Sequence, residues 1–248
     1  MGLAGAIHQS WPPFVLVSGL LLVGLAANAD GVFARAGAAL ERLPGPPVAL
    51  LVACMALVAV VTAILNLDTA VVFLTPVLVH AARRRGTPIE PFLFSAVFMA
   101  NASSLYLPGS NLTNLLVLAR EPISGATFGA QMLAPALAAT IATAALLVVG
   151  FRRTLRGGES RDGEPQVLRG PIGLLGAAAA AALTVSLHNP ALPVLGVGIV
   201  AIALQARLGR LRVAQAVEAV GPLALGALFG LSVALGVLAR NWDGPASL

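Results

Sequence analysis

Two short polar segments stand out because each interrupts a long apolar stretch. The first is Asn66–Thr69 and the second is Gly109–Asn114. Asp68 is the one acid that falls between two strongly apolar runs, and an ionised carboxylate at bilayer depth costs several kcal/mol. Such an acid is expected to bind a cation or a proton. The alternative is that Asp68 caps the helix that follows it.

The second segment carries a dense group of neutral hydrogen-bonding side chains, namely Ser110, Asn111, Thr113 and Asn114. Pro108 and Gly109 precede them and favour the end of a helix, so the backbone there is expected to expose amides and carbonyls. The positive end of a half-helix that starts near Leu115 would attract an anion. We expect this segment to contact a solute or an ion, and the alternative is an ordinary turn outside the membrane.

The composition restricts the class of protein. Of the 248 residues, 58% are hydrophobic and 10% are charged, whereas a water-soluble domain has about a quarter of its residues charged. The class that remains is an integral membrane protein, folded as a single transmembrane domain over residues 1–248. All 15 basic residues are arginines, and they lie between apolar runs without interleaved aromatic residues, which argues against a nucleic-acid partner.

No motif of a known catalytic chemistry is present. The single cysteine, Cys54, excludes a cysteine-rich metal site. Neither His80 nor His188 has a neighbour in sequence that is typical of a metal site, and nucleophile-elbow, phosphate-loop and metalloprotease motifs are absent. We therefore expect no enzymatic activity, no metal and no cofactor other than a bound proton or Na⁺.

Apolar runs predict which segments cross the bilayer. A helix needs roughly 20 mostly apolar residues to cross about 30 Å of hydrocarbon. The runs that meet or approach this length are residues 11–29, 127–151, 171–187, 191–206 and 219–239. Residues 152–170 form a basic linker between two of these spans.

Two further regions do not fit simple spans. After the polar segment Asn66–Thr69, the apolar run that resumes covers only residues 70–82, which is too short to cross. A re-entrant helical hairpin over 48–82 explains this length, because its polar tip then lies at membrane depth and both of its ends lie on one face. The region 92–119 is broken by Pro108–Asn114 and predicts a discontinuous helix. The expected fold is therefore all-α and polytopic.

The positions of the arginines predict the orientation. By the positive-inside rule, the linker 152–170 with its five arginines lies in the cytoplasm. A hairpin over 48–82 then leaves the uncharged N-terminal tail outside, whereas a full crossing would place one arginine cluster on the wrong side. We expect a multi-pass protein of the plasma membrane, the bacterial inner membrane. The same topology places the following arginines on the cytoplasmic side: Arg35, Arg42, Arg83, Arg84, Arg85, Arg207, Arg210 and Arg212.

The two polar segments together resemble a known family of transporters. Leu65–Val77 and Pro108–Leu115 are similar to the arsenical pump membrane protein (ArsB) family, within the ion-transporter superfamily that includes citrate and dicarboxylate permeases and sodium/proton antiporters. In that family an Asn/Asp-containing hairpin tip precedes an apolar arm ending in Thr-Pro, here Thr75-Pro76. A Ser-Asn-x-x-Asn break, which begins here at Ser110, interrupts the next helix. The similarity extends over about residues 13–240.

The resemblance implies a secondary transporter that exports arsenite or antimonite and binds it near the midplane, between the hairpin tip and the helix break. A sodium/proton antiporter or a citrate/dicarboxylate symporter of the same superfamily is the alternative, and a non-transporting membrane subunit is the second alternative. One departure is that Leu67 stands between Asn66 and Asp68, which are adjacent in the family. The resemblance assigns substrate or ion contact to Asn66, Asp68, Thr69, Ser110, Asn111, Thr113 and Asn114.

The resemblance also implies partners. Complete members of the superfamily resemble an inverted repeat, and this chain is expected to hold one unit and to open the second, as a partial-length member. The expected partners are the lipid bilayer, a small inorganic or organic anion, and a second copy, another chain or an ATPase subunit that completes the transporter.

Overall fold

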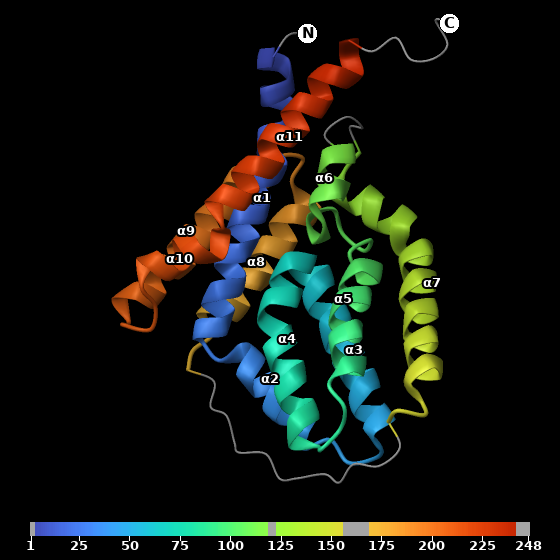
Figure 1. Ribbon diagram of the computed structural model, residues 1–248. Helices are drawn as coiled ribbons and strands as arrows, with labels where there is room; N and C mark the ends of the chain where they lie inside the picture. The colour runs from blue at the N-terminus through green and yellow to red at the C-terminus, as the bar shows by residue number, and fades with distance from the viewer. Residues whose placement is uncertain (1–2, 119–122, 156–168, 242–248) are drawn as a thin grey trace, which may run out of the picture.

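The computed structural model describes residues 3–118, 123–155 and 169–241, and these residues fold into helices without strands (Figure 1). The all-α expectation is thus confirmed. Residues 156–168, which belong to the expected basic linker, lie outside the described residues. The helices are α1 (Leu3–Ala29), α2 (Val32–Glu41), α3 (Pro47–Ile64), α4 (Leu67–Arg84), α5 (Glu90–Ser103), the 3-10 turn η1 (Pro108–Ser110), α6 (Leu112–Leu118), α7 (Gly125–Phe151), α8 (Ile172–Ser186), α9 (Ala191–Arg207), α10 (Val213–Val220) and α11 (Pro222–Asn241).

The outer surface is that of a protein in lipid. Large apolar side chains point away from the bundle on its outer helices, with Ile141 and Leu146 on α7 65% and 73% exposed and Leu223 on α11 88% exposed. A contiguous apolar surface of this kind is costly in water and favourable in hydrocarbon. Within the described residues, the stretches long and apolar enough to span a membrane are Ser10–Ala29, Pro47–Ile64, Gly125–Phe151 and Val213–Leu238.

Helix α1 is the central element of the bundle. It packs against α8, α9 and α11 on one side and against α4 and α6 on the other (Figure 1). Glycines bring α1 and α9 into backbone contact: a Cβ added at Gly198 would lie 2.7 Å from the carbonyl oxygen of Gly19, and one added at Gly19 would lie 2.7 Å from the amide nitrogen of Leu195. Small residues are the usual means of close helix packing in lipid, where burial of apolar surface gives little driving force.

Helices α3 and α4 form an antiparallel hairpin whose turn is Leu65–Asn66. The turn lies well short of the level reached by α6 and by the end of α11, whereas the open end lies beside α2 (Figure 1). Helix α5 packs against both arms, and α7 covers α5 from outside. The hairpin therefore ends inside the bundle, next to the segment where the chain between α5 and α6 loses its helical conformation.

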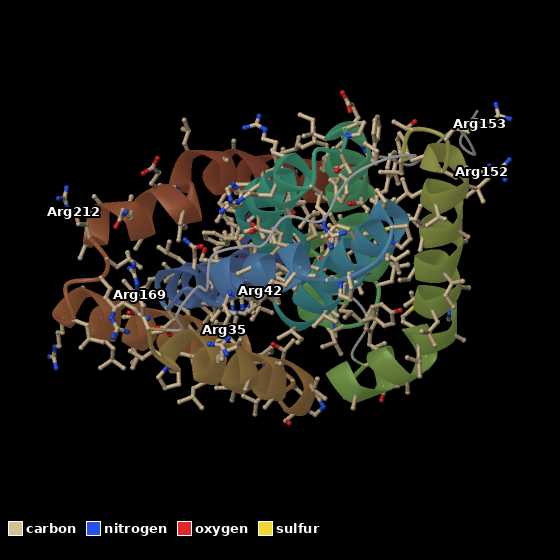
Figure 2. The ribbon with its side chains drawn as sticks, turned by 90° about the horizontal axis from the view of Figure 1, so that it is seen from below. Arg35, Arg42, Arg152, Arg153, Arg169 and Arg212 are labelled. Atoms are coloured by element: carbon tan, nitrogen blue, oxygen red, sulfur yellow. The ribbon has the colours of Figure 1, made fainter. Side chains whose placement is uncertain are left out.

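Most arginines of the described residues, among them those of α2 and those that follow α4 and α7, lie at one end of the bundle. Figure 2 looks at that end and shows Arg35 and Arg42 near its middle, Arg152 and Arg153 at one edge and Arg212 at the opposite edge. The open end of the hairpin belongs to the same face, because α4 ends in Arg83 and Arg84 and is capped by Arg85. We refer to this face as the basic end.

Asp30 is a buried acid at the basic end that links several helices. Asp30, which directly follows α1, is fully buried. Its carboxylate accepts hydrogen bonds from the Gly173 amide at 2.6 Å, from Gln205 Nε2 at 2.8 Å and from Arg210 Nη1 at 3.1 Å, and its carbonyl accepts one from the Arg169 amide at 2.8 Å. Asp30 thus joins the end of α1 to the start of α8 and the end of α9.

Three boundaries differ from the sequence expectation. Helix α1 begins at Leu3 rather than near residue 11 and continues through Pro12 and Pro13. Helix α2 was not expected. The last apolar run, expected as one span over 219–239, is preceded by the separate helix α10, which ends at Gly221 with φ +58° before Pro222 restarts the helix as α11.

The contact between α1 and α9 predicts a large effect from one added methyl group. Gly198→Ala should lower the melting temperature of the detergent-solubilised protein by roughly 5 °C, because overpacking costs about 1–3 kcal/mol and each kcal/mol corresponds to about 2–4 °C in a chain of this size. Gly196→Ala is the matched control on the same helix, since a Cβ there meets nothing within 4 Å. Equal melting temperatures for the two variants would contradict the packing.

Candidate functional site

The tip of the hairpin is held by Asn66, the N-cap residue of α4. Its Oδ1 accepts a hydrogen bond from the Thr69 amide at 2.7 Å, and both side chains are fully buried. Asp68 lies in the first turn of α4, is exposed, and has no hydrogen-bond or ion-pair partner among the described residues. The cap is therefore Asn66 and not Asp68, so the alternative structural role for Asp68 is not the one observed.

The break between α5 and α6 is a compact buried turn. Helix α5 ends at Ser103, and the 3-10 turn Pro108–Ser110 is buried at all three residues. A Cβ added at Gly109 would lie 3.1 Å from Thr184 Cγ2 on α8, so only a small residue fits there without displacing a neighbour. This burial distinguishes the segment from an ordinary turn outside the protein.

Asparagine side chains satisfy the backbone of the break. Asn114 Nδ2 donates to the Ser104 carbonyl at 2.7 Å and to the Leu107 carbonyl at 3.4 Å. Asn111 Nδ2 donates to Ser104 Oγ at 3.1 Å, and its Oδ1 accepts from the Thr113 amide at 3.0 Å. The Thr113 side chain is exposed. The two asparagines thus replace the helical hydrogen bonds that Pro108 and the unwound residues cannot make.

The hairpin tip and the break lie against each other. Ser110 Oγ donates a hydrogen bond at 3.0 Å to the carbonyl of Ala63, in the last turn of α3. The orphan carbonyls at the end of a helix need such partners. Among the seven residues that the sequence assigned to the site, this bond brings Ser110 to the tip, whereas Asn111 and Asn114 bond within the break and Asp68 and Thr113 are exposed.

Several buried polar atoms at the tip have no protein partner. In the described part of the chain these are Asn66 Nδ2, Thr69 Oγ1 and Thr62 Oγ1. Thr62 lies one turn before the tip on α3 and was not singled out from the sequence, although a hydroxyl in an otherwise apolar run was the available signal. Buried polar groups are paired in the great majority of cases, so a cluster of unpaired ones marks a place where something else can supply the partner.

Helix α1 forms the wall behind the tip. Gly24 lies so close to Thr69 that a Cβ on it would overlap the Thr69 methyl group, and Leu20 Cδ1 lies 3.4 Å from the position of a Cβ on Gly109. The central helix therefore touches both polar segments. Among the described residues no group of three or more His, Cys, Asp or Glu side chains is arranged to hold a metal ion.

A comparison with known protein families identifies the family of the chain. The citrate transporter family (CitMHS) matches residues 2–240. The chain belongs to this family. The citrate transporter family consists of secondary transporters rather than enzymes, so the chain is a membrane transport protein, as the resemblance to the wider superfamily implied. Neither the comparison with curated proteins nor that with solved structures returned a match.

The hydrogen bonds of Asn114 predict that it is a positioning residue in this citrate transporter family member. Asn114→Ala should lower the free energy of unfolding by about 1–3 kcal/mol, because it leaves the carbonyl of the buried Ser104 without a donor, whereas the Leu107 carbonyl keeps the Ser110 amide. Amide hydrogen exchange at residues 104–111 should also become faster, because the break opens more often when this hydrogen bond is lost. Thr113→Ala, at the neighbouring exposed position, should change neither quantity, and an equally large effect there would contradict this assignment.

Proposed function

We propose that this member of the citrate transporter family moves a small oxygen-rich solute across the membrane, with arsenite as the first candidate substrate. The observation that carries the proposal is the set of buried, unpaired and uncharged groups at the hairpin tip: Asn66 Nδ2, Thr69 Oγ1 and Thr62 Oγ1. They offer one amide donor and two hydroxyls that can donate or accept. Arsenite is mostly neutral at pH 7, and such a set suits a neutral hydroxylated solute.

The distribution of charge supports arsenite over a tricarboxylate. A multiply charged anion is usually held by cationic side chains or several helix N-termini. The labelled arginines lie at the basic end, beyond the open end of the hairpin, and none of the side-chain hydrogen bonds at the tip and the break involves an arginine (Figure 2). The family match favours the alternative, a citrate or dicarboxylate symporter. A sodium/proton antiporter would use the same segments.

The transport cycle needs access to this site from both sides. In our proposal α3–α4 is a re-entrant hairpin whose open end faces the cytoplasm with the basic end, and whose tip reaches the interior of the bilayer. The exposed carboxylate of Asp68 at the tip is the proposed site of the coupling proton or Na⁺. The exposed side chain of Thr113, in the first turn of α6, is proposed to contact the substrate.

Removing one hydroxyl tests the substrate site. Thr69→Val should reduce arsenite transport by purified protein in proteoliposomes about tenfold, the value of one hydrogen bond of about 1.4 kcal/mol. Its melting temperature should stay the same or rise, because Thr69 Oγ1 has no protein partner to lose.

Thr140→Val on α7 is the matched control, since Thr140 Oγ1 is also buried and unpaired but belongs neither to the hairpin nor to the break. Wild-type transport by Thr69→Val would refute the site. If the wild-type protein transports labelled citrate but not arsenite, the proposed site stands and citrate takes the place of arsenite as the proposed substrate.

A second variant tests the coupling ion. Asp68→Asn should abolish the stimulation of transport by a pH gradient or by Na⁺, while substrate counterflow without a gradient continues. Glu90→Gln is the matched control, because Glu90 is likewise an exposed acid in the first turn of a helix, α5. If both variants keep the gradient dependence, Asp68 is not the coupling site. If the wild-type protein transports nothing, the chain is the non-transporting subunit considered above.

A further inference from the structure

A groove on the outer face of the bundle lies apart from the candidate site. It has a volume of about 470 Å³ and opens between α1, α9, α10 and α11. Its wall is almost entirely apolar. The lining residues are Leu22, Ile199, Ile202, Ala203, Ala206, Val213, Ala216, Val217, Val220 and Pro222.

Two helices face this groove with matching apolar stripes. From α9 it is lined at positions 199, 202, 203 and 206, and from α10 at positions 213, 216, 217 and 220. Both sets follow the i, i+3, i+4, i+7 spacing of one helix face. At the base of the groove, Leu22 of α1 forms a buried apolar cluster with Ile202 of α9 and Ala216 of α10. Gly209 and Gly221, both at positive φ, lie before and after α10.

Positive charge lies at one end of the groove. Arg207 directly follows the lining residue Ala206, and Arg212 directly precedes the lining residue Val213. Both side chains are exposed, and neither forms an ion pair with a described residue. Arg210, which lies between them in sequence, is instead bonded to Asp30. The groove thus runs from two free guanidinium groups at the basic end toward the interior of the bundle at Leu22.

We propose that this groove binds one anionic phospholipid, with an acyl chain along the two stripes and the phosphate beside Arg207 and Arg212. The orientation fits a lipid of the leaflet at the basic end, because α9 runs from the groove-lining Ile199 to Arg207 in its last turn. A second protein helix would cover the stripes equally well, but it would leave the two arginines without a counter-charge. The charges therefore favour a headgroup phosphate, which arginine recognises with paired hydrogen bonds.

Lipid binding to the delipidated full-length protein tests the proposal. Native mass spectrometry in a non-ionic detergent would compare phosphatidylglycerol and phosphatidylcholine with identical acyl chains. The wild-type protein should bind one phosphatidylglycerol at least tenfold more tightly than phosphatidylcholine. Arg207→Gln combined with Arg212→Gln should remove this preference, since each arginine near a membrane surface contributes about fivefold in affinity for anionic lipid.

Two further variants separate the headgroup from the groove. Arg152→Gln combined with Arg153→Gln is the matched control, because these arginines lie at the opposite edge of the same face (Figure 2), and it should keep the preference. Ala203→Phe fills the groove from an exposed position and should lower the binding of both lipids. Equal binding of the two lipids by the wild-type protein, loss of preference in the Arg152/Arg153 control, or unchanged binding by Ala203→Phe would each overturn the proposal.

Discussion

Backbone amides and carbonyls that leave a helix inside a membrane protein must find partners within the protein, and the structure at the tip and the break follows from this constraint. Asn66 caps the returning helix of the hairpin, Asn114 bonds two carbonyls of the break, and Ser110 bonds the last turn of α3. Short amide and hydroxyl side chains suit this task because they reach backbone groups a few residues away. The polar residues that make the sequence unusual are thus required first to let the chain unwind inside the bundle.

The rigidity of the site depends on α1. Its glycines let α9 and the hairpin approach to backbone distance, and Asp30 fastens its end to α8 and α9. A buried ion pair such as that of Asp30 with Arg210 adds little net stability over apolar packing, but breaking it leaves a buried charge unpaired. Its role is therefore to specify how these helices meet. A hairpin resting on Gly24 through Thr69 then has a fixed surface on one side and the broken helix on the other.

Apolar run length and charge were sufficient to predict the helical hairpin and the break in the next helix. A hairpin ending near Asn66 and a break at Pro108–Ser110 are both present, because a short apolar run between polar residues leaves the chain few alternatives. Helix α10 was not predicted, although Gly221-Pro222 is a typical signal for the end of one helix and the start of another. The burial of Asp30 was not predicted either, because its partners Gln205 and Arg210 are distant in sequence and only the tertiary fold brings them together.

The seven residues assigned to the site by sequence divide into groups with different physical roles. Asn111, Asn114 and Ser110 use their side-chain donors on the protein itself, so their contribution to binding is to shape the break. Asn66 uses only its oxygen, and its amide nitrogen stays unpaired, as do the hydroxyls of Thr69 and Thr62. An unpaired buried donor costs about 1–3 kcal/mol, and a solute that accepts its hydrogen bond recovers that cost on binding. In the proposed function, the same cost would discriminate against apolar molecules, because they leave these groups unpaired.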